Sequence, residues 1–398
     1  MTKFEAPRGT HDILPSEQPL WQWVTGVAEV LCRLYGYGKI QTPAIEDTEL
    51  IARTSGEGSD IVQKELYTFA DRGGRQLTLR PEGTAPICRA YLQHGLHREP
   101  QPVKLYTIGP MWRYERPQKG RYREHWQLSV EAIGTDDPAV DAELIQLYDE
   151  LLRRLGANDY RLRLNSIGDR NCRPAYIGRL QAWLDEHDAE LGDEARAKRR
   201  TSPLRVFDAK DERVQRLLAA APKVGESLCD ACREHFDAVR THLDAYGVTY
   251  ELTPTLVRGL DYYTRTTFEF VDEAIGAQDA ICGGGRYDGL IEEIGGPPTP
   301  GIGFGAGIER LLLSLGEQRG DAEGIDVFFI AADGADRAAI GAAMAELRRR
   351  DISSDMDYAG RSAKGQRTQA GRLKARRVVV VEAGQTPDVE ALTRDLAG

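Results

Sequence analysis

Cysteines are few and long apolar runs are absent in this sequence of 398 residues. Six cysteines are too sparse for a disulfide framework, and the one CxxC pair is Cys229 with Cys232. No stretch approaches the roughly 20 apolar residues that a membrane-spanning helix needs, and the N-terminus lacks the pattern of a secretory signal. These absences predict a cytoplasmic protein without a membrane segment.

Positive charge is scarce as well. Fifty-two Lys and Arg against 62 Asp and Glu give a net charge of −10, whereas a protein that coats nucleic acid without specificity needs a broad positive surface. A hydrophobic fraction of 41% with 29% charged residues is typical of a globular protein, and the chain is longer than one core usually serves. We therefore expect several domains and a basic site that is local.

Hydrophobic periodicity predicts the first elements. Residues 17–35 carry apolar side chains at helical spacing, which predicts a long amphipathic helix. YTF and QLTL, joined by DRGGR, predict a hairpin before residue 80. A helix is expected over residues 86–99, and a strand is expected to follow it.

A basic and aromatic segment, MWRYERPQKGRYREHWQ, spans residues 111–127 and holds five Arg or Lys against two Glu. The sequence after it, WQLSVEAIG, alternates polar and apolar residues, so the segment is predicted to be the loop of a hairpin. Arginine suits phosphate because its planar guanidinium donates two parallel hydrogen bonds. A phosphate ligand is the prediction, and a solvated charged loop is the alternative.

The strand after that loop places Gln127, Ser129 and Glu131 on one face and apolar residues on the other. An amide and a carboxylate would then project together and could bind a small polar ligand. Read alone, the pattern also fits a solvent-facing strand edge. Glu82 and Thr84 in LTLRPEGTAP likewise share one face of an extended run, for which a plain strand exit is the alternative.

Three glycine-containing segments follow. In LVRGLDYYTRTTFEF, Arg258 lies beside a glycine that allows close approach of another group. The consecutive glycines 283–285 favour a nearby ligand over a plain loop. GIGFGA at 301–306 loosely matches the dinucleotide fingerprint, but prolines precede it where an uninterrupted strand is needed. We interpret it as a strand of small residues that enters a helix, with Arg310 in the first turn, where an anion is favoured.

The CxxC of LCDACREHF is followed by His235, and Cys172 could supply another ligand. Structural zinc needs four ligands at suitable spacing, and one CxxC with a distant cysteine is an incomplete set. We interpret Cys229 and Cys232 as a buried or half-buried pair and assign no metal ligands, with metal binding by this pair as the alternative.

Taken together, these segments resemble the class II aminoacyl-tRNA synthetases. The long helix that ends before Pro43, the strand, loop and strand at 104–133, and GIGFGAGIERL correspond to the three signature motifs of that class. LVRGLDYYTRTTFEFV and CGGGRYDGL resemble the two segments characteristic of histidyl-tRNA synthetases. The resemblance extends from residue 8 through Leu313 and more weakly to the C-terminus.

The resemblance implies an α+β catalytic domain with a mixed, mainly antiparallel six-stranded class II synthetase sheet, residues 1–168 and 253–318. A helical insertion, residues 169–252, and a small, shortened α/β anticodon-binding-like domain, residues 325–398, would complete the chain. The implied activity is ATP-dependent ligation of L-histidine to tRNA(His) through a histidyl-adenylate, in a homodimer, with Mg²⁺ bridging the phosphates of ATP. Ten basic against four acidic residues between 346 and 377 suit contact with the tRNA backbone.

Motif matches carry roles onto individual residues. Arg113 and Arg258 would be catalytic, the first at the α-phosphate of ATP and the second against charge that develops there as the histidine carboxylate attacks. The ATP-binding set would be Arg113, Arg121, Arg123 and Arg310, the last at the γ-phosphate. The residues that meet the tRNA acceptor end would be Arg116 and Gln118.

Histidine would be bound by Glu82, Thr84, Gln127, Glu131, Tyr262, Tyr263 and Tyr287. Glu82 and Thr84 would bind its α-amino group, and Gln127 would contact the same end. Glu131 and Tyr263 would hydrogen-bond the two imidazole nitrogens, while Tyr287 and the glycines 283–285 would form a wall. Such a site rejects side chains that lack one nitrogen, because its buried polar groups would go unpaired.

Two alternatives without catalysis stay open. The first is the synthetase-like regulatory subunit of ATP phosphoribosyltransferase, which keeps the catalytic fold without the anticodon domain and would bind histidine as a signal. Against it stand Arg113, Arg258 and Arg310, which a regulator does not need together, and the C-terminal α/β segment. The second is a synthetase-derived RNA-binding module without ATP turnover.

Overall fold

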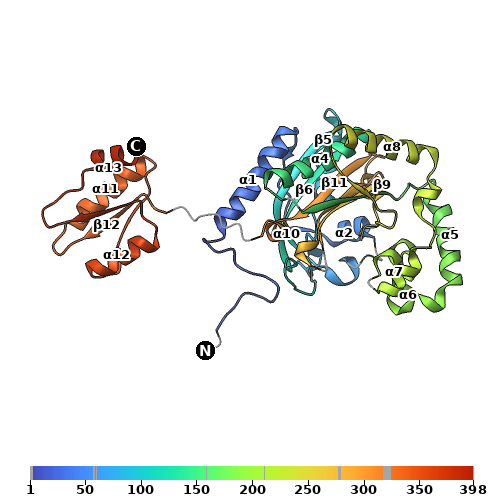
Figure 1. Ribbon diagram of the computed structural model, residues 1–398, viewed down its shortest axis with the longest axis horizontal. Coiled ribbons are helices and arrows are strands. Elements are labelled where there is room, and N and C mark those ends of the chain that lie inside the picture. Colours follow the sequence, from blue (N-terminus) through green and yellow to red (C-terminus); the bar gives the residue numbers. More distant parts are fainter. Residues whose placement is uncertain are drawn as a thin grey trace. The chain divides into compact units, whose positions relative to one another are not determined.

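The computed structural model describes residues 3–56, 59, 61–157, 159–209, 211–276, 279–316 and 324–397 (Figure 1). The chain divides into two compact units. The larger comprises Met1–Ile13 and Leu20–Gln318, and the smaller comprises Leu14–Pro19 and Arg319–Gly398. Within the described residues, no helix combines the length and the apolar character needed to cross a membrane.

An eight-stranded sheet organises the larger unit, in the order β1-β5-β6-β11-β10-β9-β7-β8. Its strands are β1 (Gly38–Lys39), β5 (Val103–Trp112), β6 (Glu124–Ile133), β7 (Tyr160–Ser166), β8 (Glu251–Leu252), β9 (Thr264–Asp272), β10 (Ala280–Arg286) and β11 (Gly301–Gly307). The expected count of six is wrong, because β1 and β8 add a two-residue parallel strand at each edge. The six strands between them pair antiparallel, as predicted.

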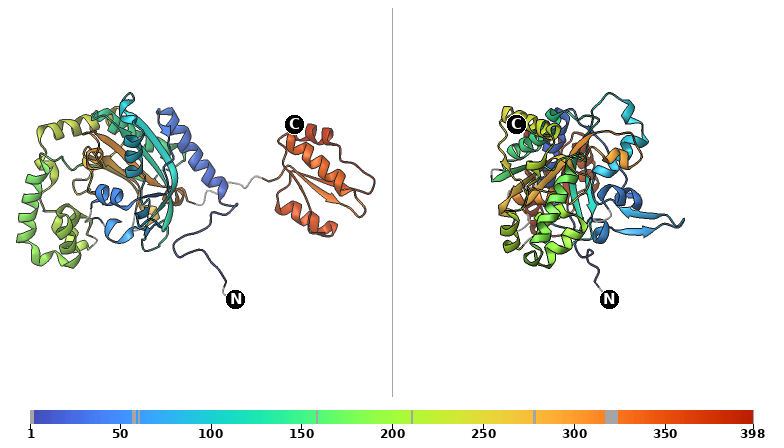
Figure 2. Two further views of the ribbon diagram at one scale, coloured as in Figure 1. Left: turned by 180° about the vertical axis from the view of Figure 1, so that it is seen from behind. Right: turned by 90° about the vertical axis from the view of Figure 1, so that its right-hand side faces the viewer.

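Three helices cover one face of this sheet: α1 (Gln18–Leu34), α4 (Pro138–Arg154) and α8 (Asp230–Ala245) (Figures 1 and 2). Their apolar stripes meet residues such as Val130 and Phe304 in one continuous core. Local signals begin α4, since the carboxylate of Asp137 accepts a hydrogen bond from the backbone N–H of Ala139 and proline occupies the first helical position. The helix predicted over 17–35 is confirmed as α1.

A smaller antiparallel sheet contains β2 (Ile45–Asp47), β3 (Thr68–Ala70) and β4 (Gln76–Leu79), so the predicted hairpin is confirmed. Beside it lie α2 (Thr48–Ser55) and α3 (Thr84–Gln93). The helix expected over 86–99 starts two residues earlier and ends sooner. Gly95, in a left-handed conformation with φ of 69°, separates it from a 3₁₀ turn at Leu96–Arg98.

The stretch after β7 is helical and has a core of its own, which includes Tyr176, Leu180 and Val206. Its helices are α5 (Arg173–Glu186), α6 (Gly192–Thr201), α7 (Glu212–Leu218) and the start of α8. Short helices elsewhere in the larger unit are α9 (Leu290–Glu293) and α10 (Ile308–Ser314). A π-helical segment lies at Ile61–Glu65, and short 3₁₀ segments lie at Asp188–Glu190, Pro203–Asp208, Val224–Ser227 and Glu273–Ile275.

The smaller unit confirms the predicted alternation of strands and helices. Its parallel sheet has the order β13-β12-β14. The elements are β12 (Val327–Ala331), α11 (Arg337–Arg349), β13 (Ser354–Met356), α12 (Ala363–Arg372), β14 (Arg377–Val381) and α13 (Val389–Ala397). Apolar residues of β12 and α11, such as Phe329 and Leu347, form its core.

A buried ion pair joins α4 to β10. The side chains of Arg286 and Asp141 are both 0% exposed. Arg286 donates through Nε to Asp141 at 3.2 Å and through Nη1 to the carbonyl of Thr135 at 2.8 Å, and its Nη1 also lies 3.2 Å from Asp288. Removing one partner would leave a charge in the interior without compensation.

We therefore expect Asp141→Ala to lower the free energy of unfolding by about 3–5 kcal/mol, measured by urea denaturation. The matched control is Glu212→Ala, which removes an exposed partner of Arg216 at 3.8 Å and should leave the urea midpoint unchanged. Equal midpoints for the two variants would contradict the importance of the buried pair.

Candidate functional site

A cavity of ≈ 400 Å³ opens over the polar face of the large sheet. It is lined by residues of β6, β9, β10, β11 and α10 and by the segment that precedes β9. Nine of the residues selected from the sequence line it: Glu82, Thr84, Arg113, Arg121, Gln127, Arg258, Tyr262, Tyr263 and Arg310. Segments more than 200 residues apart in the chain thus meet at one site.

Glycines make room for this cavity. In β11 the apolar residues Ile302 and Phe304 enter the core, while the alternate positions are glycine. A Cβ atom at Gly303 or Gly305 would collide with the side chain of Glu131 or Gln127, respectively. GIGFGA is therefore a strand that runs into α10, which confirms our interpretation of it.

One end of the site holds two buried carboxylates. Glu82 accepts hydrogen bonds from the backbone N–H of Thr84 at 2.6 Å and of Ala85 at 2.8 Å. The Thr84 hydroxyl donates to Glu131 Oε1 at 2.7 Å, and the Tyr287 hydroxyl donates to Glu131 Oε2 at 2.6 Å. Burial raises the pKa of Glu82 and raises that of Glu131 well above its ordinary value. Glu131 and Tyr287 do not line the cavity, because they lie one layer behind Thr84.

Four arginines also line the cavity: Arg113, Arg121, Arg258 and Arg310. Arg113 donates through Nε to the carbonyl of Pro81 at 2.8 Å, Arg121 pairs with Glu115, and Arg258 pairs with Glu269. Within the described part of the chain, the buried Nε of Arg258 has no hydrogen-bond acceptor. An oxygen-bearing anion in the cavity could supply that acceptor.

The remaining selected residues belong to the loop between β5 and β6. Arg123 lies over the ring of Tyr114, 3.7 Å from its centre, and does not line the cavity. Arg116 and Gln118 are exposed at the loop tip, where Gln118 pairs with Arg121 across a short turn. The hairpin predicted around this loop is confirmed.

His125 lines the cavity and was missed in the sequence. Burial and the charges of Arg113, Arg121 and Arg310 lower its pKa to about 3. The sequence pattern could have identified it, because the alternation that places Gln127 on the polar face of the strand places residue 125 there too. Carboxylates that line the cavity and were also overlooked are Glu65, Glu115, Asp208, Glu269 and Glu309.

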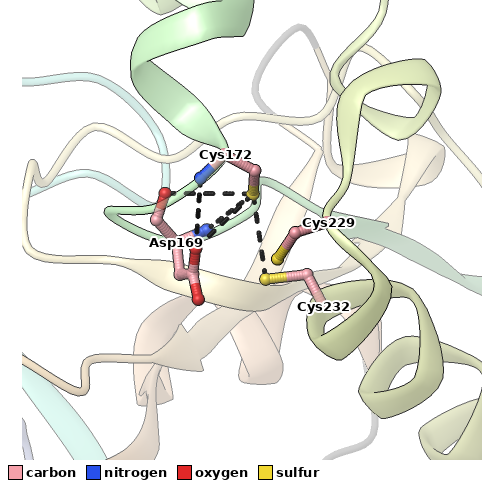
Figure 3. Close-up of side chains that lie close together, drawn as sticks. All are labelled: Asp169, Cys172, Cys229 and Cys232. Atoms are coloured by element: carbon pink, nitrogen blue, oxygen red, sulfur yellow. Dashed lines mark hydrogen bonds between the residues drawn. The ribbon is translucent and has the colours of Figure 1, made fainter.

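A second group of side chains lies outside this cavity (Figure 3). Asp169, Cys172, Cys229 and Cys232 each bring one ligand atom, and these four atoms lie within 4.8 Å of one another. From the sequence, the cysteines and His235 were considered as ligands, and Asp169 was missed. His235 faces Asp141 instead, with 3.7 Å between Nε2 and Oδ2.

Comparison with known proteins identifies the family that this chain resembles. The family model "Histidyl-tRNA synthetase" matches residues 9–311. Histidine–tRNA ligase of Desulforamulus reducens is 48% identical over 395 residues, 98% of this chain and 94% of that protein. Its counterpart from Caldanaerobacter subterraneus is 48% identical over 382 residues, 95% of this chain and 91% of that one.

Solved structures agree. Apo S. aureus histidyl-tRNA synthetase matches with a TM-score of 0.79 at 38% identity, over 96% of this chain and 92% of that one. An ATP phosphoribosyltransferase regulatory subunit/histidyl-tRNA synthetase from Bacillus halodurans matches with a TM-score of 0.69 at 24% identity, over 97% and 100%. At that identity the second match indicates a shared fold only.

We expect His125 to stay neutral across the physiological range, because its pKa is depressed to about 3. NMR of labelled histidine should show no titration of this imidazole between about pH 5 and 8, where an unperturbed histidine titrates. Arg113→Met removes one of the charges that depress the pKa, so the pKa should rise in that variant. Titration near pH 6.5 in the parent protein would contradict this expectation.

Proposed function

The chain belongs to the histidyl-tRNA synthetase family, and we propose that its cavity joins L-histidine to tRNA(His) in two steps. In the first, the histidine carboxylate attacks the α-phosphate of ATP and pyrophosphate leaves. In the second, a ribose hydroxyl at the tRNA 3′ end attacks the acyl carbon and AMP leaves. The observation that carries the proposal is one cavity lined both by the buried carboxylate of Glu82 and by four arginines, Arg113, Arg121, Arg258 and Arg310.

Histidine is proposed to bind at the carboxylate end. Its ammonium group would meet Glu82, with Thr84 and Gln127 beside it. Tyr263 at the wall and Glu131 behind Thr84 would take the two imidazole nitrogens. Access to Glu131 requires that the Thr84 hydroxyl turn away from Oε1, which it now contacts at 2.7 Å.

Aromatic residues support that end. Tyr262 lines the cavity and packs edge-on against Tyr287, with 5.9 Å between ring centres. Gly283 to Gly285 would form a wall with them, because glycine lets a ligand approach the backbone closely. The Tyr287 hydroxyl would hold Glu131 in place through their hydrogen bond.

ATP is proposed to bind along the arginines that line the cavity. Arg113 and Arg258 would contact the α-phosphate and stabilise the charge that develops there during attack. Arg121 and Arg310 would contact the outer phosphates, Arg310 from the first turn of α10. Arg123, stacked on Tyr114, would support the loop from outside the cavity.

The same cavity offers the carboxylate oxygens of Glu115, Glu269 and Glu309, the kind of ligand that Mg²⁺ prefers. One or two of these carboxylates, together with phosphate oxygens of ATP, would hold a magnesium ion. Such an ion neutralises charge on the phosphates.

tRNA is proposed to contact both units. Arg116 and Gln118 at the exposed loop tip would meet the acceptor end. In the smaller unit the exposed basic side chains that suit an RNA backbone are Arg361, Lys364, Arg367, Arg372, Lys374, Arg376 and Arg377. We further propose that the enzyme acts as a cytoplasmic homodimer. We assign residues 1–168 and 253–318, which contain the antiparallel strands of the large sheet, as the class II catalytic domain. Residues 169–252 would be the insertion, and residues 325–398 would be the anticodon-binding-like domain.

The two steps can be separated with two arginine variants. Arg258→Ala should abolish histidine-dependent exchange of labelled pyrophosphate into ATP, because it removes charge from the attacked phosphate. The matched control is Arg116→Ala, which should leave exchange intact and slow tRNA charging, since Arg116 lies at the loop tip. Folded parent protein that binds histidine without any exchange would favour the regulatory alternative.

Glu131→Ala should raise the KM for histidine in the exchange assay by about 10- to 100-fold, because a buried hydrogen bond to the imidazole would be lost. Glu131→Gln keeps the shape and one acceptor, so its KM should rise less. Circular dichroism would establish that both variants are folded. An unchanged KM in Glu131→Ala would remove Glu131 from the histidine site.

A further inference from the structure

We infer that Asp169, Cys172, Cys229 and Cys232 form a structural zinc site in the helical insertion, at its start after β7 (Figure 3). Asp169 and Cys172 come from the loop between β7 and α5, and the two other cysteines begin α8. Four ligands from two segments are a complete set for structural zinc, and three thiolates are ligands that zinc favours.

The distances match one ion better than they match a disulfide. Zinc–sulfur bonds of about 2.3 Å in a tetrahedron place neighbouring ligands roughly 3.8 Å apart. The sulfurs of Cys172 and Cys232 are 3.8 Å apart, and all four ligand atoms lie within 4.8 Å of one another. A disulfide needs sulfurs about 2.05 Å apart, and all three cysteines are free thiols.

The loop that carries Cys172 is shaped around its sulfur. The backbone N–H of Asp169 donates to Cys172 Sγ at 3.4 Å, a bond that would also stabilise a metal-bound thiolate. Gly168 lies beneath with φ of +67°, and a Cβ there would come within 2.7 Å of the same sulfur. Asp169 is held in turn by the N–H of Asn171 at 2.9 Å.

Charge around the cluster also suits a cation with anionic ligands. Three thiolates and one carboxylate around Zn²⁺ leave two negative charges. Arg265 lies 3.7 Å from Asp169, and Arg173 donates to the carbonyl of Gly168 at 3.0 Å. These two guanidinium groups would offset the excess.

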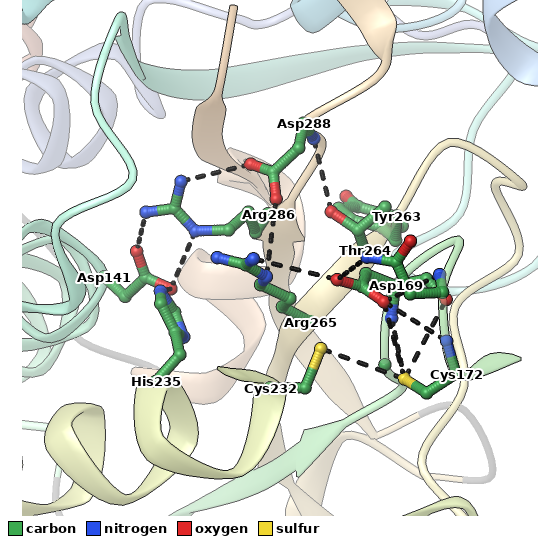
Figure 4. Close-up of polar contacts among 12 residues, drawn as sticks. Asp141, Asp169, Cys172, Cys232, His235, Tyr263, Thr264, Arg265, Arg286 and Asp288 are labelled. Atoms are coloured by element: carbon green, nitrogen blue, oxygen red, sulfur yellow. Dashed lines mark hydrogen bonds and ion pairs between the residues drawn. The ribbon is translucent and has the colours of Figure 1, made fainter. Parts of the chain in front are cut away.

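The role of the ion follows from the position of the cluster, which lies close to Tyr263 and Arg265 (Figure 4). Arg173 donates to the carbonyl of Tyr263 at 2.6 Å, and the N–H of Arg265 donates to the carbonyl of Gly168 at 2.7 Å. The loop with two of the ligands is thus bonded to the backbone beside a residue of the cavity wall. Zinc would fasten the insertion to that backbone and would not touch the reacting atoms.

The test is the zinc content of the full-length protein, purified under reducing conditions without chelator and measured by plasma mass spectrometry. We expect one zinc per chain in the parent protein. Cys229→Ser and Cys232→Ser should lower the zinc content at least about tenfold. Cys32→Ser is the matched control, because Cys32 is a buried free thiol in α1 far from the cluster in sequence, and it should retain zinc.

Cobalt provides a second readout that does not depend on enzymatic activity. Co²⁺ added to metal-free protein should produce the visible bands of a tetrahedral ion and thiolate charge-transfer absorption in the near ultraviolet. Should the cysteine variants fail to fold, Asp169→Asn tests the fourth ligand and should bind cobalt at least about tenfold more weakly. Folded, reduced parent protein that binds neither metal would overturn the proposal, as would metal binding that survives Cys229→Ser and Cys232→Ser together.

Discussion

The site depends on one steric constraint, the lack of side chains along one face of β10 and β11. Gly283 in β10 lies opposite Gly305 in β11, and both lie where a Cβ atom would collide with a polar side chain of the site. Alternation along the strand turns Ile302 and Phe304 to the other face, where they anchor the core. The glycines that leave room for ligands are thus held in register by the apolar residues between them, which pack in the core.

Much of this arrangement is local and could be predicted from the sequence. The period of two around Gln127 predicted the polar face, and the prolines before residue 301 with the alternating small residues of 301–306 predicted a strand instead of a nucleotide-binding turn. His125 was missed because the alternation was not followed one step back. The two-residue strands β1 and β8 are too short to leave any pattern.

Other features come from contacts between distant segments, which one sequence does not encode in any spacing. Glu131 accepts hydrogen bonds from Thr84 and Tyr287, which are 47 and 156 positions away. Cys172 reaches Cys232 across 60 positions, and Asp169 joins them although carboxylates are common on any surface. Only the fold reveals which of the many carboxylates meets the cysteines.

Helix α8 belongs to two cores at once. Cys232 near its start packs with the apolar residues of the insertion, whereas Val239 and Leu243 further along pack beneath the large sheet. A helix shared in this way couples the two cores mechanically. Unfolding of either core would remove apolar contacts from the same helix. The insertion is therefore built to melt together with the sheet in one cooperative transition, unlike a domain that hangs from a flexible linker.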